Sequence, residues 1–300
     1  MSKPTPPICS YEGSDYQQHF WDEGGRAYED SVEAKALKRL LPKEGEFLLE
    51  LGAGAGRNTP RYQNFERVAL LDYSRTQLEQ ARERLGESER YLFVAADIYD
   101  LPFVDGLFDG ATMIRTLHHL SDPQLALDQI SRVISPEGIF ILEFANKRNL
   151  KAMLRYFFGK QSWSPYSHEP VEFAELNFDF HPKAVRDYLR QAGFDIERQL
   201  TVSHFRVEAL KRNVPTRVLA GLDGLFQWTG GFLQVSPSVF TRCRAQECKQ
   251  QAEGGVLFQC PICGTSLDGR EQDLHCEDCG RVWEYRDGIY DFRKNPPELN

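Results

Sequence analysis

The stretch Phe47-Leu48-Leu49-Glu50-Leu51-Gly52-Ala53-Gly54-Ala55-Gly56-Arg57 decides the fold of this chain. An apolar run of strand length ends in a carboxylate, Glu50, and then breaks into closely spaced glycines. Glycine lets the backbone turn tightly and approach a ligand that a side chain would exclude. Because such turns follow strands in every nucleotide-binding α/β fold, the pattern predicts this class of fold but does not choose its ligand.

Two carboxylates later in the chain narrow the choice of ligand. Asp72 follows the apolar run 68–71 and stands 20 residues after Gly52, the reach of an acid that accepts hydrogen bonds from a ribose diol. Asp97 closes a third apolar run, residues 91–96. Since parallel strands end at the same edge of a sheet, Glu50, Asp72 and Asp97 are expected together at that edge. The pattern predicts a ligand that contains an adenosine.

The glycine spacing separates two kinds of adenosine cofactor. A dinucleotide site uses G-x-G-x-x-G, in which bare backbone and a helix N-terminus face a pyrophosphate. Gly52, Gly54 and Gly56 are one residue short of that spacing, and the carboxylate of Glu50 would repel a pyrophosphate. Near a sulfonium or an ammonium group the same carboxylate is favourable. S-adenosylmethionine carries both cations and no phosphate, so it is the predicted cofactor.

Several segments in the right order resemble the class I S-adenosylmethionine-dependent methyltransferases, in particular the group that includes the quinone-biosynthesis C-methyltransferases. The matching segments are ELGAGAGR, LDYSRTQLEQAR, AADIYDLPFVDGLFDGATMIRTLHHLSDP and RVISPEGIFILEF, all within residues 46–145. The resemblance implies an α/β fold, a Rossmann-like doubly wound sheet of seven strands with an antiparallel seventh. It also implies a methyltransferase that uses S-adenosylmethionine.

The resemblance also assigns residues to the parts of the cofactor. The methionine end of the cofactor is expected to contact Glu50, Gly52, Ala53, Gly54 and Gly56. The ribose is expected to contact Asp72 and Tyr73, and the adenine to contact Asp97 and Ile98. Charge and the position of the N-terminal segment suggest Arg57, Arg26 or Tyr28 for the cofactor carboxylate. Arg115, at the end of the fourth strand, is also expected in the cofactor site.

The end of the fourth strand bears on the methyl acceptor. It reads Met113-Ile114-Arg115-Thr116, which lacks the Asn/Asp-Pro-Pro-aromatic motif of amino-group methyltransferases and has no Pro-Cys nucleophile. An O or C atom of a small molecule is therefore favoured, with an anionic lipid- or sugar-linked intermediate as one example. An RNA or translation-factor methyltransferase and a non-catalytic cofactor-binding protein are the alternatives.

His118 and His119 follow this strand directly. Both are candidates for a general base, because imidazole titrates near neutrality. The alternative interpretation is a pair of loop histidines that bond the backbone or pack beside the adenine.

Four of the seven cysteines form two C-x2-C motifs, Cys260/Cys263 and Cys276/Cys279, separated by twelve residues. This spacing predicts a four-thiolate zinc site, and four ligands leave no open position, so the zinc is expected to be structural. Two disulfides or free thiols are the alternative. Residues 274–289 are similar to the small zinc-ribbon activator of tRNA, rRNA and release-factor methyltransferases. This resemblance suggests a partner-like module fused in cis, with a protein-facing or scaffolding role.

Charge is unevenly distributed. Residues 1–145 hold 15 Lys and Arg against 24 Asp and Glu, residues 146–255 hold 16 against 11, and residues 256–293 hold 4 against 8. The acidic ribbon makes nucleic acid a less favoured partner. The basic middle region is either a solvated helix face or a surface that attracts an anionic substrate.

Three hundred residues with 41% hydrophobic content allow one large core and an appendage. The predicted domains are a methyltransferase domain (1–245, with a helical segment 10–42 and a lid-like insertion 159–180), a linker (246–255) and a zinc ribbon (256–294). The expected strands are 46–51, 67–71, 91–95, 107–113, 138–144, 196–203 and 238–243; the expected helices are 15–41 (capped at Asp30-Ser31), 58–65, 75–85, 123–133 and 182–192.

The apolar segment 218–235 is interpreted as core, with a lipid-contacting helix or a dimer contact as alternatives. No apolar run of 18 residues and no secretory leader are evident, so a cytoplasmic protein is expected, with peripheral membrane contact left open.

Overall fold

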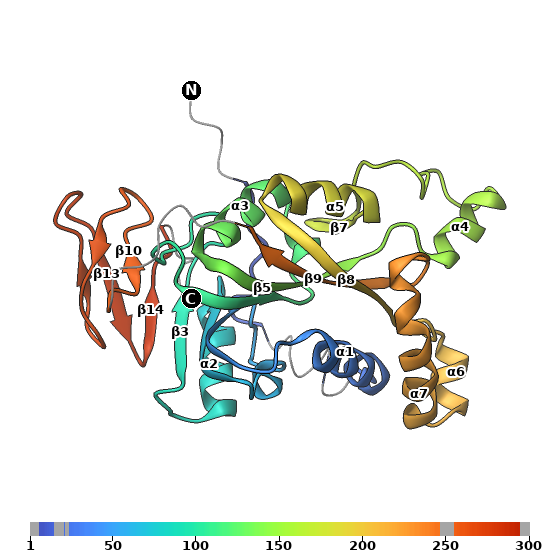
Figure 1. Ribbon diagram of the computed structural model, residues 1–300, viewed down its shortest axis with the longest axis horizontal. Helices are drawn as coiled ribbons and strands as arrows, with labels where there is room; N and C mark the ends of the chain where they lie inside the picture. The colour runs from blue at the N-terminus through green and yellow to red at the C-terminus, as the bar shows by residue number, and fades with distance from the viewer. Residues whose placement is uncertain (1–5, 15–20, 22–23, 247–254, 295–300) are drawn as a thin grey trace.

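The computed structural model describes residues 6–14, 21, 24–246 and 255–294 (Figure 1). The predicted linker therefore lies almost wholly outside the described residues, and so does much of the N-terminal part of the predicted segment 10–42.

A twisted sheet forms the centre of the molecule (Figure 1). Its order is β3-β2-β1-β4-β5-β9-β8, with β1 to β5 parallel and β9 antiparallel to both of its neighbours. The strands are β1 (Gly45–Leu51), β2 (Phe65–Asp72), β3 (Tyr91–Ala95), β4 (Phe108–Met113), β5 (Ile134–Ala145), β8 (Phe194–Val202) and β9 (Ser238–Ala245). The chain order reverses at β1, so the predicted doubly wound sheet is confirmed.

Helices cover both faces of this sheet. On one face, α3 (Pro123–Val133) and α5 (Pro182–Gln191) contribute buried side chains to a core that includes Leu127 and Val185. On the other face, α1 (Ala27–Leu40), α2 (Arg75–Leu85) and α7 (Thr216–Phe226) contribute to a second core. Each strand alternates its side chains between these two cores, as the period of two requires.

The predicted starts of α2 and α3 are sharply defined. Ser74 accepts a hydrogen bond from Gln77 N at 3.3 Å, and Asp122 accepts one from Leu125 N at 3.1 Å, with Pro123 at the first helical position. These caps satisfy amide groups that a helix leaves unpaired at its start.

Three local predictions were wrong. The helix expected over 15–41 is not continuous, because residues 24–26 lie outside any helix and α1 starts only at Ala27. Residues 58–65 do not form an α-helix: a single 3-10 turn, η2 (Thr59–Arg61), precedes β2, because Phe65 already pairs with Gly45 in the sheet. The cap at Asp30-Ser31 is also wrong. Helix α1 begins at Ala27, and the carboxylate of Asp30, inside the first turn, bonds the guanidinium groups of Arg57 and Arg61 instead.

The long connection after β5 contains a helix and a hairpin. Helix α4 (Leu150–Phe157) projects from the body of the molecule, and β6 (Val171–Ala174) pairs with β7 (Asn177–Asp179) (Figure 1). After β8 the chain forms α6 (Glu208–Asn213), α7 and the 3-10 turn η4 (Gln227–Gly231).

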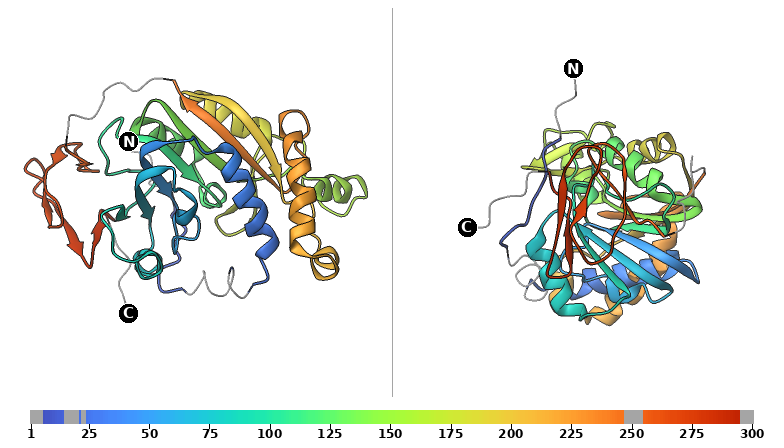
Figure 2. Two further views of the ribbon diagram at one scale, coloured as in Figure 1. Left: turned by 60° about the horizontal axis from the view of Figure 1, so that its bottom comes forward. Right: turned by 90° about the vertical axis from the view of Figure 1, so that its left-hand side faces the viewer.

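The C-terminal ribbon extends the central sheet rather than forming a separate body (Figure 2). Its strands are β10 (Phe258–Gln259), β11 (Ser266–Leu267), β12 (Leu274–His275), β13 (Val282–Arg286) and β14 (Ile289–Asp291). Strand β14 pairs in parallel with β3, and the sheet continues through β13 to β12. The rings of Phe103 and Phe258 stack with centroids 5.7 Å apart, so the ribbon shares the core of the main domain.

Candidate active site

A cavity opens at the carboxyl ends of β1, β2 and β4, where the chain order reverses. Ligands of open α/β sheets bind at such a point. Most predicted residues line this cavity: Gly52, Ala53, Gly54, Arg57, Asp72, Tyr73, Asp97, Ile98, Arg115 and His119. Four do not: Glu50, Gly56, Arg26 and His118.

The glycine loop is fixed by two features. Gly52 has φ +64°, and a Cβ at this position would lie 2.1 Å from Thr116 Oγ1, so only glycine fits. Gly54 donates its backbone N–H to Asp72 Oδ2 at 2.8 Å. This bond ties the loop after β1 to the carboxylate after β2, and both face the same cavity.

Asp72 and Asp97 are held by backbone amides. Asp72 accepts a second bond, from Ser74 N at 2.9 Å, and Asp97 accepts one from Tyr99 N at 2.9 Å. Burial raises the pKa of both carboxyl groups above the usual value, although these hydrogen bonds oppose the rise. Their orientation is thus set before any ligand arrives.

Glu50 lies beneath the loop instead of in the cavity. Its side chain is buried on the α1 side of the sheet, where it accepts hydrogen bonds from Thr59 Oγ1 at 2.6 Å and Tyr62 OH at 3.4 Å. Burial raises the pKa of Glu50 to about 7. In this structure the carboxyl group therefore supports the turn at η2 and contacts no cavity surface.

A charged cluster forms the end of the cavity beside α1. Buried Glu33 accepts hydrogen bonds from Arg57 at 2.8 Å and from Arg115 Nε at 3.0 Å. The ring of Trp21 lies under both guanidinium groups, 3.5 Å from Arg57 and 4.8 Å from Arg115. The backbone of Arg115 has φ +58°, and its N–H donates to buried Glu143 at 2.9 Å.

The other residues considered for the cofactor carboxylate lie elsewhere. Arg26 pairs with Glu29 at 3.4 Å, and Tyr28 OH donates to Asp223 at 2.8 Å. The same Asp223 oxygen lies 3.0 Å from His204 Nδ1. The bond between Tyr28 and Asp223 joins α1 to α7.

Sequence reasoning missed the N-terminal segment of the site. Ile8, Cys9 and Tyr11 line the cavity together with Trp21, although none stands in a recognisable motif. The segment is fixed by Glu12, which accepts hydrogen bonds from Arg75 N and Thr76 N at the start of α2, both at 3.0 Å. Arg293, at the end of the ribbon, also donates to Glu12 at 2.8 Å.

His119 is held on both sides of its ring. Its Nδ1 lies 3.1 Å from the carbonyl oxygen of Leu176 in the β6–β7 hairpin, and its Nε2 lies 3.1 Å from Tyr11 OH. Burial lowers the pKa of His119 below the usual value. The ring of His118 lies beside it, with centroids 4.0 Å apart and the planes tilted by 45°, but outside the cavity lining.

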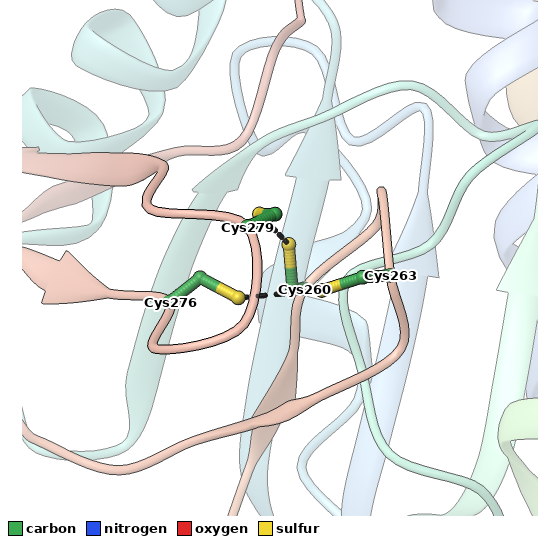
Figure 3. Close-up of side chains that lie close together, drawn as sticks. All are labelled: Cys260, Cys263, Cys276 and Cys279. Carbon is green, nitrogen blue, oxygen red and sulfur yellow. Dashed lines mark hydrogen bonds between the residues drawn. The ribbon is translucent and has the colours of Figure 1, made fainter.

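The four predicted cysteines converge in the ribbon (Figure 3). Their sulfur atoms all lie within 4.8 Å of one another, with Cys260 and Cys279 3.7 Å apart and Cys263 and Cys276 3.3 Å apart. Thiolates at the usual zinc–sulfur distance of about 2.3 Å would stand about 3.8 Å apart on a tetrahedron. The donor set and its spacing therefore fit zinc.

No helix in the described part of the chain is long and apolar enough to cross a membrane.

Comparison with known proteins places the site in a family. A family model described as a methyltransferase domain matches residues 49–142, which span the glycine loop, Asp72, Asp97 and His119. The chain is 31% identical to the demethylmenaquinone methyltransferase of Chlamydia pneumoniae, over 60% of this chain and 79% of that protein. It is 38% identical to the O-methyltransferase cnsE of Penicillium expansum, over 53% of this chain and 55% of that protein. The chain spans about half the length of several curated relatives it matches.

Solved structures agree on the fold. A putatively S-adenosylmethionine-dependent methyltransferase of Listeria monocytogenes matches with a TM-score of 0.54 at 15% identity, covering 73% of this chain and 99% of that chain. A chain from the complex between the Haloferax volcanii Trm112 methyltransferase activator and a methyltransferase matches with a TM-score of 0.53 at 18% identity, covering 78% and 98%. Together with the relative from Chlamydia pneumoniae, these findings show that the chain belongs to the class I S-adenosylmethionine-dependent methyltransferase family.

Proposed function

We propose that this chain binds S-adenosylmethionine in the cavity at the carboxyl ends of β1, β2 and β4 and transfers its methyl group to an O or C atom of a small-molecule acceptor. One observation carries the proposal: the bond from Gly54 N to Asp72 joins the glycine loop and the ribose-binding acid at a single cavity. The names of the relatives, an O-methyltransferase and a demethylmenaquinone methyltransferase, support an O or C acceptor.

The lining residues fit the parts of the cofactor. Asp72 offers carboxylate oxygens to the ribose hydroxyls, and Asp97, Ile98 and Tyr99 frame the adenine. Arg57 and Arg115 lie at the far end, where a carboxylate of the ligand would meet positive charge. When bound, S-adenosylmethionine supplies a methyl group already activated by its sulfonium. The protein then has mainly to align the acceptor and to exclude water.

His119 is the proposed general base for a hydroxyl acceptor. The Leu176 carbonyl accepts a hydrogen bond from Nδ1–H, which leaves Nε2 as the basic nitrogen. In this structure Tyr11 OH is hydrogen-bonded to Nε2. An acceptor hydroxyl would replace Tyr11 at this nitrogen and pass its proton to Nε2. Because the β6–β7 hairpin provides Leu176, this hairpin would act as the lid and set the base as it closes.

The ribbon is proposed to hold one structural zinc through Cys260, Cys263, Cys276 and Cys279. A four-thiolate site is closed, so the metal would order the ribbon and take no part in methyl transfer. Strand β14 already pairs with β3 of its own chain. We therefore infer that the ribbon supports its own methyltransferase domain, and that any protein partner would bind its outer surface.

Calorimetry tests the cofactor site. Asp72→Asn keeps the shape of the side chain but removes its charge, and hydrogen bonds to a charged group contribute about 1.5–3 kcal/mol each. The affinity for S-adenosylmethionine is expected to fall at least about tenfold. Asp109→Asn is the matched control: Asp109 also accepts two backbone amides, Glu46 N and Phe47 N, but does not line the cavity. Equal affinity in wild type and Asp72→Asn would refute the ribose assignment.

The acceptor class is tested with methyl-labelled S-adenosylmethionine and fractionated cell extract. The proposal expects label in the small-molecule or lipid fraction and none with Asp72→Asn. Label in RNA or protein would support the RNA or translation-factor alternative. Cofactor binding without any transfer would support a non-catalytic role.

A further inference from the structure

Helices α4, α6 and α7 form the end of the molecule opposite the ribbon (Figure 1). Of the eighteen large apolar side chains exposed in the described chain, fourteen lie in or directly beside α4, α6, α7 and η4. We call these fourteen the distal face: Leu150, Leu154, Tyr156, Phe157, Phe158, Val207, Leu210, Val218, Leu222, Leu225, Phe226, Trp228, Phe232 and Leu233. A concentration of this kind marks an interaction site.

Helix α4 has almost no cover from its own chain. Of its eight residues only Ala152 is buried, whereas Phe157 is 80% exposed and Phe158, directly after the helix, is 65% exposed. Asn149 caps the helix by accepting from Ala152 N at 2.9 Å, and Leu150 N donates to Val235 O at 2.8 Å. A helix this short is not stable by itself in water. An apolar surface outside the fold would therefore stabilise it.

Helix α7 is apolar on two sides. Leu219 and Ala220 pack into the core, which confirms part of the core interpretation of 218–235. Val218, Leu222 and Leu225, spaced as i, i+4 and i+7, form a second apolar stripe, with Leu225 72% exposed. A helix that is apolar all round is expected to be buried. The side chains of the outward stripe remain 43–72% exposed in the described part of the chain.

Basic residues lie beside the apolar side chains of α4. Residues 149–160 hold three basic residues and no acidic one. Lys151, Arg155, Lys160 and Arg206 line a groove between α4 and the segment before α6, and Leu150, Leu154 and Phe158 form its apolar wall. The acidic Glu208 stands nearby on α6 and is 89% exposed. The partner that fits is anionic and apolar at once.

A second copy of this chain fits poorly, because a two-fold contact through the distal face would bring its basic groove residues close to those of the other copy. Nucleic acid supplies negative charge but no counterpart for the exposed Phe157, Leu225 and Phe232. An anionic bilayer supplies both: phosphates at its surface and acyl chains beneath.

We propose that the distal face docks on an anionic lipid bilayer, with Phe157, Phe158, Leu225 and Phe232 inserted at the acyl boundary and the groove lysines and arginines at the phosphates. Trp228 supports this orientation. Its ring is 51% exposed and lies 5.2 Å from the Arg39 guanidinium and 5.4 Å from that of Arg198, so it presents an apolar body flanked by charge. Side chains of this character favour the bilayer interface.

Docking would bring the bilayer close to the active site. Arg206 lines the groove and also pairs with Glu29 of α1 at 3.6 Å. One turn further along α1, Glu33 holds Arg57 and Arg115 in the cofactor cavity. Bilayer binding itself does not depend on the proposed methyl transfer.

Co-sedimentation of the full chain with lipid vesicles tests the proposal. We expect binding to vesicles of phosphatidylcholine mixed with phosphatidylglycerol, weaker binding when salt is added, and much weaker binding to phosphatidylcholine alone. Phe157→Ser and Phe232→Ser are each expected to lower the partition coefficient about tenfold or more. Lys151→Glu is expected to lower it about fivefold or more. All three side chains are exposed, so unchanged circular dichroism is expected.

Matched controls lie away from the distal face. Ile262→Ser removes a ribbon side chain that is 49% exposed, and Lys43→Glu reverses an exposed charge after α1; both should bind vesicles like the wild type. Failure of the wild type to sediment with anionic vesicles would overturn the proposal. So would equal losses in controls and distal-face variants, or a dimer that Phe157→Ser dissociates. Calorimetry with S-adenosylmethionine keeps this result separate from the proposed function, since Phe157→Ser should leave cofactor affinity unchanged.

Discussion

His119 joins two segments that are far apart in the chain. Tyr11, from the N-terminal segment, and Leu176, from the β6–β7 hairpin, contact opposite nitrogens of its ring. Neither contact can be predicted from the sequence, because both partners lie far from His119 along the chain. Together these two contacts fix the tautomer and the orientation of the ring. A histidine positioned in this way differs from a loop histidine that bonds only the local backbone.

The pH dependence of turnover tests the role of His119. Burial lowers its pKa, and the charge of Arg115 adds to this effect, so the neutral form that accepts a proton persists below pH 6.5. The acid limb of kcat should therefore have its midpoint below 6.5. His119→Ala should lower kcat by about 10²–10⁴ and remove this limb. His275→Ala, an exposed ribbon histidine, is the control and should change neither. An unchanged limb in His119→Ala would show that another group titrates.

For individual residues, local sequence spacing predicted part of the cavity lining but did not predict its N-terminal part. Gly52, Gly54, Asp72 and Asp97 could be placed because each follows an apolar run directly, and parallel strands bring their ends together. Tyr11 could not, because its contact with the cavity depends on the path of a segment with no periodic pattern.

Glu50 shows a second limit of prediction from the sequence. The sequence correctly places it near the end of β1, but alternation along the strand directs its side chain to the α1 side, toward Thr59 and Tyr62. Its carboxyl group, with a pKa raised to about 7, is therefore less anionic at neutral pH than the cation argument assumed.

Among the elements, the pairing of β14 with β3 connects the ribbon to the parts of the chain that line the cavity. Asp291 at the end of β14 accepts from Arg293 at 2.6 Å, and Arg293 reaches Glu12 at 2.8 Å and Tyr73 O at 3.3 Å. The guanidinium thus bridges the ribbon, the N-terminal segment and the loop after β2. Three separate parts of the chain, two of which line the cavity, therefore share one side chain.

Arg293→Gln tests this connection. Its guanidinium is only 3% exposed, so its loss leaves Glu12 and Asp291 without their shared charge partner. We expect the affinity for S-adenosylmethionine to fall on the order of tenfold, and hydrogen exchange to rise in residues 6–14. Arg286→Gln is the control, since the Arg286 side chain pairs with Asp273 at 2.6 Å, is 53% exposed and makes none of its described bonds to Glu12. Unaltered cofactor affinity in Arg293→Gln would mean that the N-terminal segment is held by other contacts.

Helices α2 and α3 were predictable, whereas the ribbon pairing was not. Ser74 and Asp122 are local caps that a short window of sequence reveals. Strand β14 has three residues and pairs with a strand about two hundred positions earlier, and no local pattern encodes that register. The prediction of a helix at 58–65 was wrong for a related reason: Phe65 pairs with Gly45 of the sheet, and the local sequence does not reveal that pairing.

At the scale of the whole molecule, the described residues form one sheet of ten strands that runs from the ribbon to the distal face. The buried ribbon residues Phe258 and Trp283 belong to the same core as Phe103 and Phe108. The sequence predicted the ribbon as a domain of its own, residues 256–294. The shared core instead provides part of its stability and covers the edge of β3, which would otherwise offer unpaired backbone groups to other chains.

Zinc removal and truncation test this continuity. Because ribbon and domain share a core, the full chain should unfold in a single thermal transition. Cys260→Ser should release one zinc equivalent and lower the midpoint of that same transition, since binding energy of a structural zinc contributes to folding. Cys9→Ser, which changes a cysteine outside the cluster, should retain the metal.

Truncation after residue 245 removes the strand that pairs with β3, so gel filtration should show self-association. Two separate transitions in the full chain, or a monomeric truncated chain with an unchanged midpoint, would show that the ribbon folds independently of the sheet.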